Sequence, residues 1–360
     1  MRLFKCQSCD NPIYFENTSC IRCNHRLGYL PDMFTMSAIE PAGPAQFTAF
    51  AAPDNPWKSC ANAALDACNW LLPADSPAEF CAACRHNRTV PNLQSPGNML
   101  AWRRMEMAKH RLIYTLMRLG LPLANRQDGP EGGLVFDFLE DSAAPNAPRV
   151  LTGHDEGIVT LALKEADDAE RERRRTEMGE PYRTLLGHFR HEVGHYYWNV
   201  LVRDQGRQAE CRAVFGNDRE DYGDALQRHY KEGAPPDWQE HFVSTYATTH
   251  AWEDFAETWA HYLHIVDSLE TATTFGLEVH PEITSQPGME ASPSLDPHAP
   301  GHFDALIGEW LPLTYAMNGM NRSMGLNDLY PFILSAQVVR KLAFIHNLVH
   351  LPRKPMALAA

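Results

Sequence analysis

The strongest constraint on this chain is one short pattern in the stretch 184–203. His191, Glu192 and His195 form the pattern H-E-x-x-H. Positions i and i+4 are stacked neighbours on an α-helix, so the two imidazoles can share one Zn²⁺ while Glu192 reaches a water beside it. The pattern therefore predicts a helix that carries a metal site suited to hydrolysis.

The residues around the pattern agree with an amphipathic helix. At about 100° per residue, His191, Glu192 and His195 gather on one side. The apolar residues gather on the opposite side: Leu186, Phe189, Val193, Tyr196, Tyr197 and Val200. We expect one face to be buried and the other to line a cleft. The alternative is an ordinary surface helix whose histidines are solvated.

Composition narrows the functional class. The chain has 360 residues, is 44% hydrophobic and carries a formal net charge of −13. Phosphate binding depends largely on Lys and Arg, so a nucleic-acid partner is not expected. The sequence has no apolar run of the roughly 18 residues needed to span a bilayer, and its start does not resemble a signal peptide. We expect a cytoplasmic protein with no membrane partner.

Four cysteines near the start have the spacing of a zinc ribbon. Cys6, Cys9, Cys20 and Cys23 make two C-x-x-C knuckles separated by a short arm over residues 11–17 that we expect to form a hairpin. Each knuckle lets two thiolates approach one tetrahedral ion. A redox dithiol is the alternative, but it would need a single C-x-x-C on a βαβ unit. The spacing favours a structural zinc ion.

A second cysteine group follows. Cys60, Cys68, Cys81 and Cys84 contain only one knuckle, and His86 comes shortly after. A second four-cysteine zinc site is the preferred interpretation. Buried free thiols, or a site in which His86 replaces one cysteine, are the alternatives. Basic and acidic residues nearly balance over residues 1–88, which favours a protein-binding role for this part of the chain.

The remaining segments suggest a mixed fold. Residues 24–56 are rich in Pro, Ala and Gly, and we interpret them as an extended connector. A long helix is expected to begin at Ser95-Pro96 and to end before Gly120 and Pro122. Strands are expected at residues 134–139, 149–152 and 157–163, a loop or helix at 164–175, and helices at 310–321 and 330–349.

Catalytic zinc needs a third protein ligand, and the stretch 244–264 offers one. Its second half has helical spacing, with a core stripe of Trp252, Phe255, Ala256, Trp259, Leu263 and Val266. The helical wheel places Glu253 at the border of this stripe and points Asp254 away from it. We therefore assign Glu253 as the third ligand and Glu257, one turn on, as the acceptor for a ligand imidazole N–H. The alternative is that both glutamates are exposed helix charges.

These motifs together resemble a known family. Residues 6–23, 80–91, 187–198 and 246–257 are similar to bacterial zinc-binding metallopeptidases with an N-terminal zinc ribbon. The last stretch also resembles the active-site helix of lethal-factor-type gluzincins, although His250 stands where those enzymes carry Asn. The resemblance implies that Glu253 binds zinc and that Tyr246 can stabilise the transition state. It covers the whole chain.

The resemblance and the motifs give one expected architecture. The fold class is α+β, with a zinc ribbon at 1–30, a connector and second cysteine group at 31–94, a mainly helical zincin-like metallopeptidase domain with a small β-sheet at 95–350, and a tail at 351–360. The expected cofactors are one catalytic zinc and one or two structural zinc ions.

The expected activity is peptide-bond hydrolysis with Glu192 as general base. Two alternatives remain. One is a non-enzymatic, zinc-stabilised interaction or scaffold protein that recruits a partner through its ribbon. The other is amide hydrolysis on a substrate other than a protein.

Overall fold

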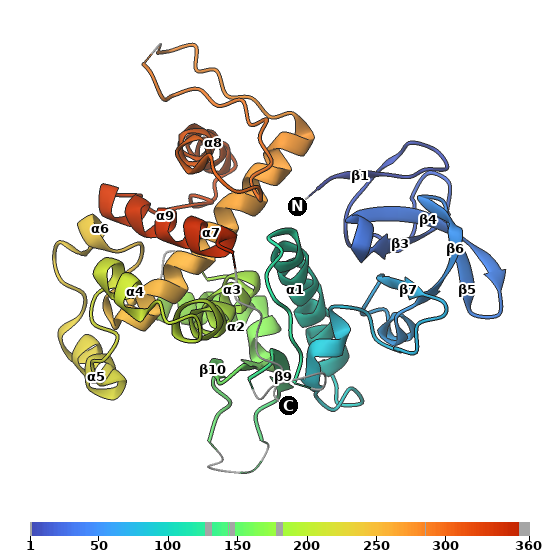
Figure 1. The fold of residues 1–360 in the computed structure, drawn as a ribbon, viewed down its shortest axis with the longest axis horizontal. Coiled ribbons are helices and arrows are strands. Elements are labelled where there is room, and N and C mark those ends of the chain that lie inside the picture. The colour runs from blue at the N-terminus through green and yellow to red at the C-terminus, as the bar shows by residue number, and fades with distance from the viewer. Residues whose placement is uncertain are drawn as a thin grey trace. The chain divides into compact units, whose positions relative to one another are not determined.

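The computed structural model describes residues 2–126, 132–142, 144, 148–177, 183–284 and 286–352. The chain forms two compact units (Figure 1). The first comprises Met1–Gly153 and Ile158–Arg171, and the second comprises His154–Gly157 and Glu172–Ala360. The predicted α+β class is confirmed, because a strand-rich N-terminal part is followed by a mostly helical one. The predicted C-terminal tail lies outside the described residues from 353 onward.

The first unit begins with a small ribbon and a five-stranded antiparallel sheet. In the ribbon, β1 (Phe4–Lys5) pairs antiparallel with β2 (Pro12–Ile13), so the hairpin closes around the first knuckle and not within residues 11–17. The sheet has the order β3-β4-β5-β6-β7. Its strands are β3 (Arg26–Leu30), β4 (Thr35–Gly43), β5 (Gln46–Ala49), β6 (Ala52–Ser59) and β7 (Leu71–Pro73).

The connector predicted over residues 24–56 is therefore wrong. Four of the five strands begin there, and the apolar side chains of the sheet form a core of Leu30, Ile39, Ala49, Trp57 and Leu71. The register shifts twice, between Pro41 and Gly43 and between Thr48 and Ala49. Such bulges interrupt the two-residue alternation by which a strand is recognised in a sequence.

A helix and a parallel sheet complete the first unit. Helix α1 (Asn98–Arg118) confirms the predicted long helix, with Gly97 at its N-cap. Strand β9 (Val135–Leu139) pairs in parallel with β8 (Asn87–Thr89) and with β11 (Ile158–Ala162). The strand predicted at 149–152 does not form; the next strand, β10 (Gly153–Asp155), begins just after these residues. The charged run after β11 forms a 3₁₀ turn (Leu163–Ala166) and α2 (Asp168–Glu177).

The second unit is helical, and its centre is a pair of packed helices. Helix α3 (Leu185–Trp198) lies along α7 (Ala251–Phe275), where the rings of Tyr197 and Trp259 stack with centroids 4.9 Å apart. A Cβ on Gly194 would stand only 3.0 Å from the Cα of Ala256. Glycine at this position therefore lets the two backbones approach closely, which offsets its helix-propensity cost of about 1 kcal/mol.

The other helices surround this pair. They are α4 (Gln208–Phe215), α5 (Tyr222–Glu232), α6 (Trp238–His241), α8 (Phe303–Ser323) and α9 (Ala336–His350). The predicted C-terminal helices are thus confirmed, although α9 begins six residues after the predicted start at Tyr330. Among the described helices, none is both long and apolar enough to cross a bilayer.

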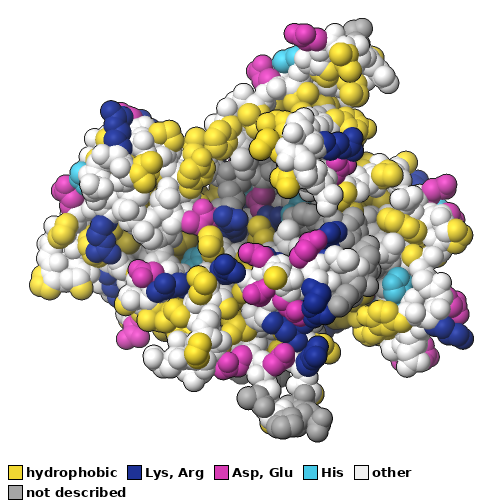
Figure 2. All heavy atoms as spheres, turned by 180° about the vertical axis from the view of Figure 1, so that it is seen from behind, with side chains coloured by type: hydrophobic (Ala, Val, Ile, Leu, Met, Phe, Trp, Pro, Cys, Tyr) yellow, Lys and Arg dark blue, Asp and Glu magenta, His cyan; other side chains and the backbone are white. Residues whose placement is uncertain are grey.

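On the face that Figure 2 shows, basic and acidic side chains are interspersed and neither charge is concentrated.

A buried ion pair joins α7 to α9. Asp254 is fully buried on α7, and its Oδ2 lies 2.6 Å from Nζ of Lys341 on α9. The prediction that Asp254 points away from the packed side is wrong, because the helical wheel of α7 alone does not show that α9 covers this face.

Candidate metal centre

Helix α3 holds the first two candidate ligands. Its N-cap Thr184 accepts a hydrogen bond from the backbone N–H of Gly187 at 3.0 Å, which fixes the helix start two turns before His191. The predicted apolar face is buried except for Leu186, which is half-buried. His195 and Glu192 are nearly buried, and His191 is half-buried on the opposite face.

Helix α7 holds the third candidate ligand, Glu253. His250 is its N-cap, and the ring Nδ1 accepts from the backbone N–H of Trp252 at 3.0 Å. His250 Nε2 lies 3.1 Å from the backbone oxygen of Glu220, so this nitrogen donates. His250 therefore caps the helix in place of a smaller residue. Glu253 lies in the first turn after this cap, and only 2% of its surface is exposed.

The three side chains present three donor atoms to one point. Nε2 of His191 lies 3.2 Å from Nε2 of His195. Oε2 of Glu253 lies 3.0 Å from the first of these nitrogens and 3.4 Å from the second. Ligands about 2.0–2.1 Å from a tetrahedral ion stand roughly 3.3 Å apart. Oε2 is buried and has no hydrogen-bond partner among the described residues apart from these two imidazole nitrogens, so the donor set fits a divalent cation.

Glu257 contacts His191, the candidate ligand that it was expected to orient. Its Oε1 lies 2.7 Å from Nδ1 of His191, and its Oε2 accepts a hydrogen bond from Oγ of Ser244 at 2.6 Å. A carboxylate on Nδ1 fixes the proton there and leaves Nε2 to face a metal. Ser244 was not expected in this role.

The sequence reasoning also missed Tyr222. This residue opens α5, and its hydroxyl donates to Oε1 of Glu253 at 2.8 Å. The two oxygens of Glu253 thus have separate partners, since Oε1 binds a phenol while Oε2 faces the imidazoles. No motif in the sequence marks Tyr222, which stands 31 residues before Glu253.

Aromatic side chains enclose the site. The ring of Trp252 lies against His195 with centroids 3.8 Å apart, although this tryptophan was predicted to belong to the core stripe. Tyr246 places its ring 5.9 Å from that of His191. His154 lies 6.2 Å from His195, and burial, followed by the charge of His195, lowers the pKa of His154 to about 3.

The electrostatics of the centre favour a cation. Burial alone would lower the pKa of His191, but its bonds to Glu253 and Glu257 raise that pKa well above the usual value. Burial raises the pKa of Glu192, and the charge of Glu253 adds to this while His191 and His195 oppose it. Burial likewise raises the pKa of Tyr246, which therefore stays a hydrogen-bond donor at neutral pH.

In the first unit, each of the two cysteine groups brings its own four sulfur atoms close together. The four Sγ atoms of Cys6, Cys9, Cys20 and Cys23 lie within 4.8 Å of one another, and so do those of Cys60, Cys68, Cys81 and Cys84. Each group could hold one tetrahedral ion. His86 stands apart, because its Nδ1 lies 2.8 Å from the backbone oxygen of Leu134 and it is in none of the possible metal-binding groups among the described residues.

Comparison with known proteins identifies the family. The family model described as "putative zinc-binding metallo-peptidase" matches residues 98–348. The chain belongs to this family. A zinc-ribbon domain matches residues 3–95. The predicted family and its N-terminal zinc ribbon are thereby confirmed, and zinc is the metal that both family descriptions name.

Relatives extend this match over almost the whole chain. One protein from Mycobacterium bovis and two from strains of Mycobacterium tuberculosis are each 42% identical to it over 350 residues, which cover 97% of this chain and 95% of theirs. All three are called uncharacterized proteins. No solved structure matches this one.

Proposed function

We propose that this family member is a zinc-dependent peptidase of gluzincin type, with His191, His195 and Glu253 as ligands of the catalytic metal. The observation that carries the proposal is the triangle of Nε2, Nε2 and Oε2 with sides of 3.0–3.4 Å. Three protein ligands leave a fourth position open for water or substrate, as catalytic zinc requires. When bound there, zinc lowers the pKa of water and polarises a peptide carbonyl.

Glu192 is the proposed general base. It lies on α3 between the two ligand histidines but outside the triangle, so its carboxylate is available for proton transfer. Its burial raises the pKa of the carboxyl, which strengthens it as a base near neutral pH. Glu192 takes a proton from the attacking water and passes it to the leaving amine nitrogen.

Three further side chains support this chemistry. Glu257 holds His191 through Nδ1, and Tyr222 holds Glu253 through Oε1, so both ligands are fixed before substrate binds. Tyr246 is proposed to donate a hydrogen bond to the oxyanion that develops on the scissile carbonyl. Its raised pKa, due first to burial, keeps the hydroxyl protonated for this task.

The proposal is tested by incubating the full-length, zinc-loaded protein with a mixed peptide library and identifying products by mass spectrometry. We expect discrete cleavages that disappear with a zinc chelator and return when zinc is restored. A protein that retains zinc dependent on His191 and yet cleaves no peptide would contradict the proposed activity. That result would favour a zinc-stabilised interaction protein instead.

Replacing Tyr246 by phenylalanine tests its role separately. Loss of one oxyanion donor typically costs 10²–10³-fold in kcat, so we expect about a 100-fold lower kcat with KM nearly unchanged. Steady-state kinetics on a peptide from the library provide the measurement. Phenylalanine at Tyr230, an exposed tyrosine on α5, is the matched control and should leave kcat unchanged. An unaltered kcat for Tyr246→Phe would remove this residue from the mechanism.

A further inference from the structure

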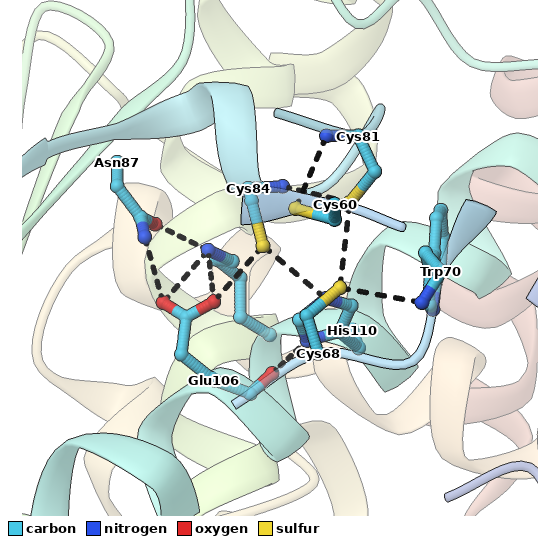
Figure 3. A network of polar contacts seen from close by, with 9 residues as sticks. Cys60, Cys68, Trp70, Cys81, Cys84, Asn87, Glu106 and His110 are labelled. Atoms are coloured by element: carbon cyan, nitrogen blue, oxygen red, sulfur yellow. Dashed lines mark hydrogen bonds and ion pairs between the residues drawn. The ribbon is translucent and has the colours of Figure 1, made fainter. Parts of the chain in front are cut away.

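The second cysteine group receives hydrogen bonds from three directions within its own loop (Figure 3). The backbone N–H groups of Trp70, Cys81 and Cys84 donate to Sγ of Cys68, Cys60 and Cys81 at 3.3, 3.4 and 3.4 Å. Backbone donors of this kind lower the charge on thiolates that share a metal ion. Sγ of Cys84 is different, because the groups that face it come from helix α1.

His110 on α1 points one ring nitrogen at Cys84. Its Nε2 lies 3.5 Å from Sγ of Cys84, and its Nδ1 lies 2.5 Å from the backbone oxygen of Glu106. A carbonyl oxygen can only accept, so Nδ1 carries a hydrogen. A metal-bound thiolate also only accepts, which requires a hydrogen on Nε2 as well. The ring is held edge-on against Trp70, with centroids 5.3 Å apart.

A fully buried ion pair stands beside this contact. Nζ of Lys109 lies 2.9 and 2.8 Å from the two carboxylate oxygens of Glu106, and both side chains have no exposed surface. Oε2 of Glu106 lies 3.5 Å from Sγ of Cys84, and Lys109 also donates to Oδ1 of Asn87. Two cations and one carboxylate therefore surround the thiolate. Their net charge of about +1 offsets part of the net charge of −2 that four thiolates around one Zn²⁺ carry.

The zinc ribbon repeats the arrangement at its own last cysteine. Nδ1 of His25 lies 3.3 Å from Sγ of Cys23, while its Nε2 lies 3.1 Å from Oε1 of Glu40. In each group a histidine thus joins the last sulfur to an oxygen acceptor. The difference is exposure, because Glu40 lies on the surface whereas His110 and its neighbours are buried.

A rival arrangement would place a metal between Cys84, Glu106 and His110, whose donor atoms also lie within 4.8 Å of one another. The ammonium group of Lys109 argues against it. Lys109 is bonded to both oxygens of Glu106, so a metal cation on that carboxylate would stand next to a buried positive charge.

We propose that Cys60, Cys68, Cys81 and Cys84 form a tetrathiolate zinc site whose negative charge is partly offset from α1, with His110 donating to Cys84 and Lys109 restraining Glu106. His110 is then a positioning residue of the metal site. The zinc-ribbon match ends at residue 95 and the metallopeptidase match begins at residue 98, so α1 belongs to the metallopeptidase match. The proposed second zinc site therefore has its four cysteines in the zinc-ribbon match and its supporting residues in the metallopeptidase match.

Zinc release from the full-length protein tests the role of His110. Loss of such a hydrogen-bond partner typically costs 10–100-fold in metal affinity, so His110→Phe should release one zinc at least about 10-fold faster to a colorimetric chelator. The zinc ion that is released faster should be the same ion that is missing from Cys84→Ser. His110→Gln keeps an N–H donor and should release it at nearly the wild-type rate. His25→Phe, the control in the ribbon, should not alter this phase.

Two spectroscopic measurements keep the proposal testable if His110→Phe fails to fold. In cobalt-substituted protein, sulfur-to-metal charge-transfer bands should have the intensity of four thiolates for each cobalt ion bound by cysteines, and the bands of the second cysteine group should shift in His110→Gln. In cadmium-substituted wild type, NMR should show hydrogens on both ring nitrogens of His110 and coupling between cadmium and the Nε2 hydrogen. An unprotonated Nε2, or an equal release rate in wild type and His110→Phe, would overturn the proposal.

Discussion

Replacing Glu192 by glutamine should abolish most peptide hydrolysis while zinc stays bound. General acid–base catalysis contributes about 10²–10⁴-fold to rate, and an amide cannot take the proton of the attacking water. Glutamine has nearly the same shape as glutamate, and Glu192 is not one of the three donors of the triangle. We therefore expect kcat/KM to fall by this factor with no change in zinc content.

The measurement combines kinetics on a library-derived peptide with elemental analysis of the same preparation. Glu240→Gln, an exposed glutamate on α6, is the matched control and should keep full activity. Full activity in Glu192→Gln would exclude Glu192 as general base. Loss of zinc together with activity would instead assign it a role in holding the metal.

Replacing Lys341 by methionine should destabilise the second unit strongly. The side chain of Lys341 is 4% exposed and that of Asp254 is 0% exposed, and burial raises the pKa of Asp254 to about 7 even with Lys341 opposing the shift. Nζ also donates to the backbone oxygen of His241 at 2.6 Å. Removing one partner of a buried pair costs about 3–5 kcal/mol because the other charge is left without compensation.

Denaturant titration followed by tryptophan fluorescence measures this loss. The double variant with Asp254→Asn removes the second charge and should recover most of the free energy of unfolding. Because Asp254 adjoins Glu253 on α7, the single variant should also bind zinc at the helix site more weakly. A single variant that loses less than about 1 kcal/mol would show that the pair contributes little.

The residues that the structure brings together in the candidate site could be named from the sequence where their placement follows helical periodicity. His191 and His195 are one turn apart, and the border position of Glu253 on α7 could be derived from its apolar neighbours. Glu257 followed from the same helix. Each of these residues is fixed by spacing within one element, and the close approach of α3 and α7 at Gly194 then brings the two sets together.

Other features depend on which elements pack together, and local pattern does not contain that information. Tyr222 reaches Glu253 from a separate helix, and Lys341 reaches Asp254 from α9. His110 lies 26 residues after Cys84, whereas the nearer His86 turns to Leu134. The five-stranded sheet was missed for a local reason, because two register shifts and its prolines hide the alternation of its strands.

Elemental analysis of metal content tests the central claim most directly, which is that α3 and α7 form a metal site separate from the cysteines. Wild type should contain one zinc for each of the two four-cysteine groups and one for the set His191, His195 and Glu253, and His191→Ala should contain one fewer. His188→Ala, on the same helix but outside the donor set, should keep all of them, and Cys6→Ser should lose a different ion. Equal zinc content in wild type and His191→Ala would contradict the site and with it the proposed peptidase.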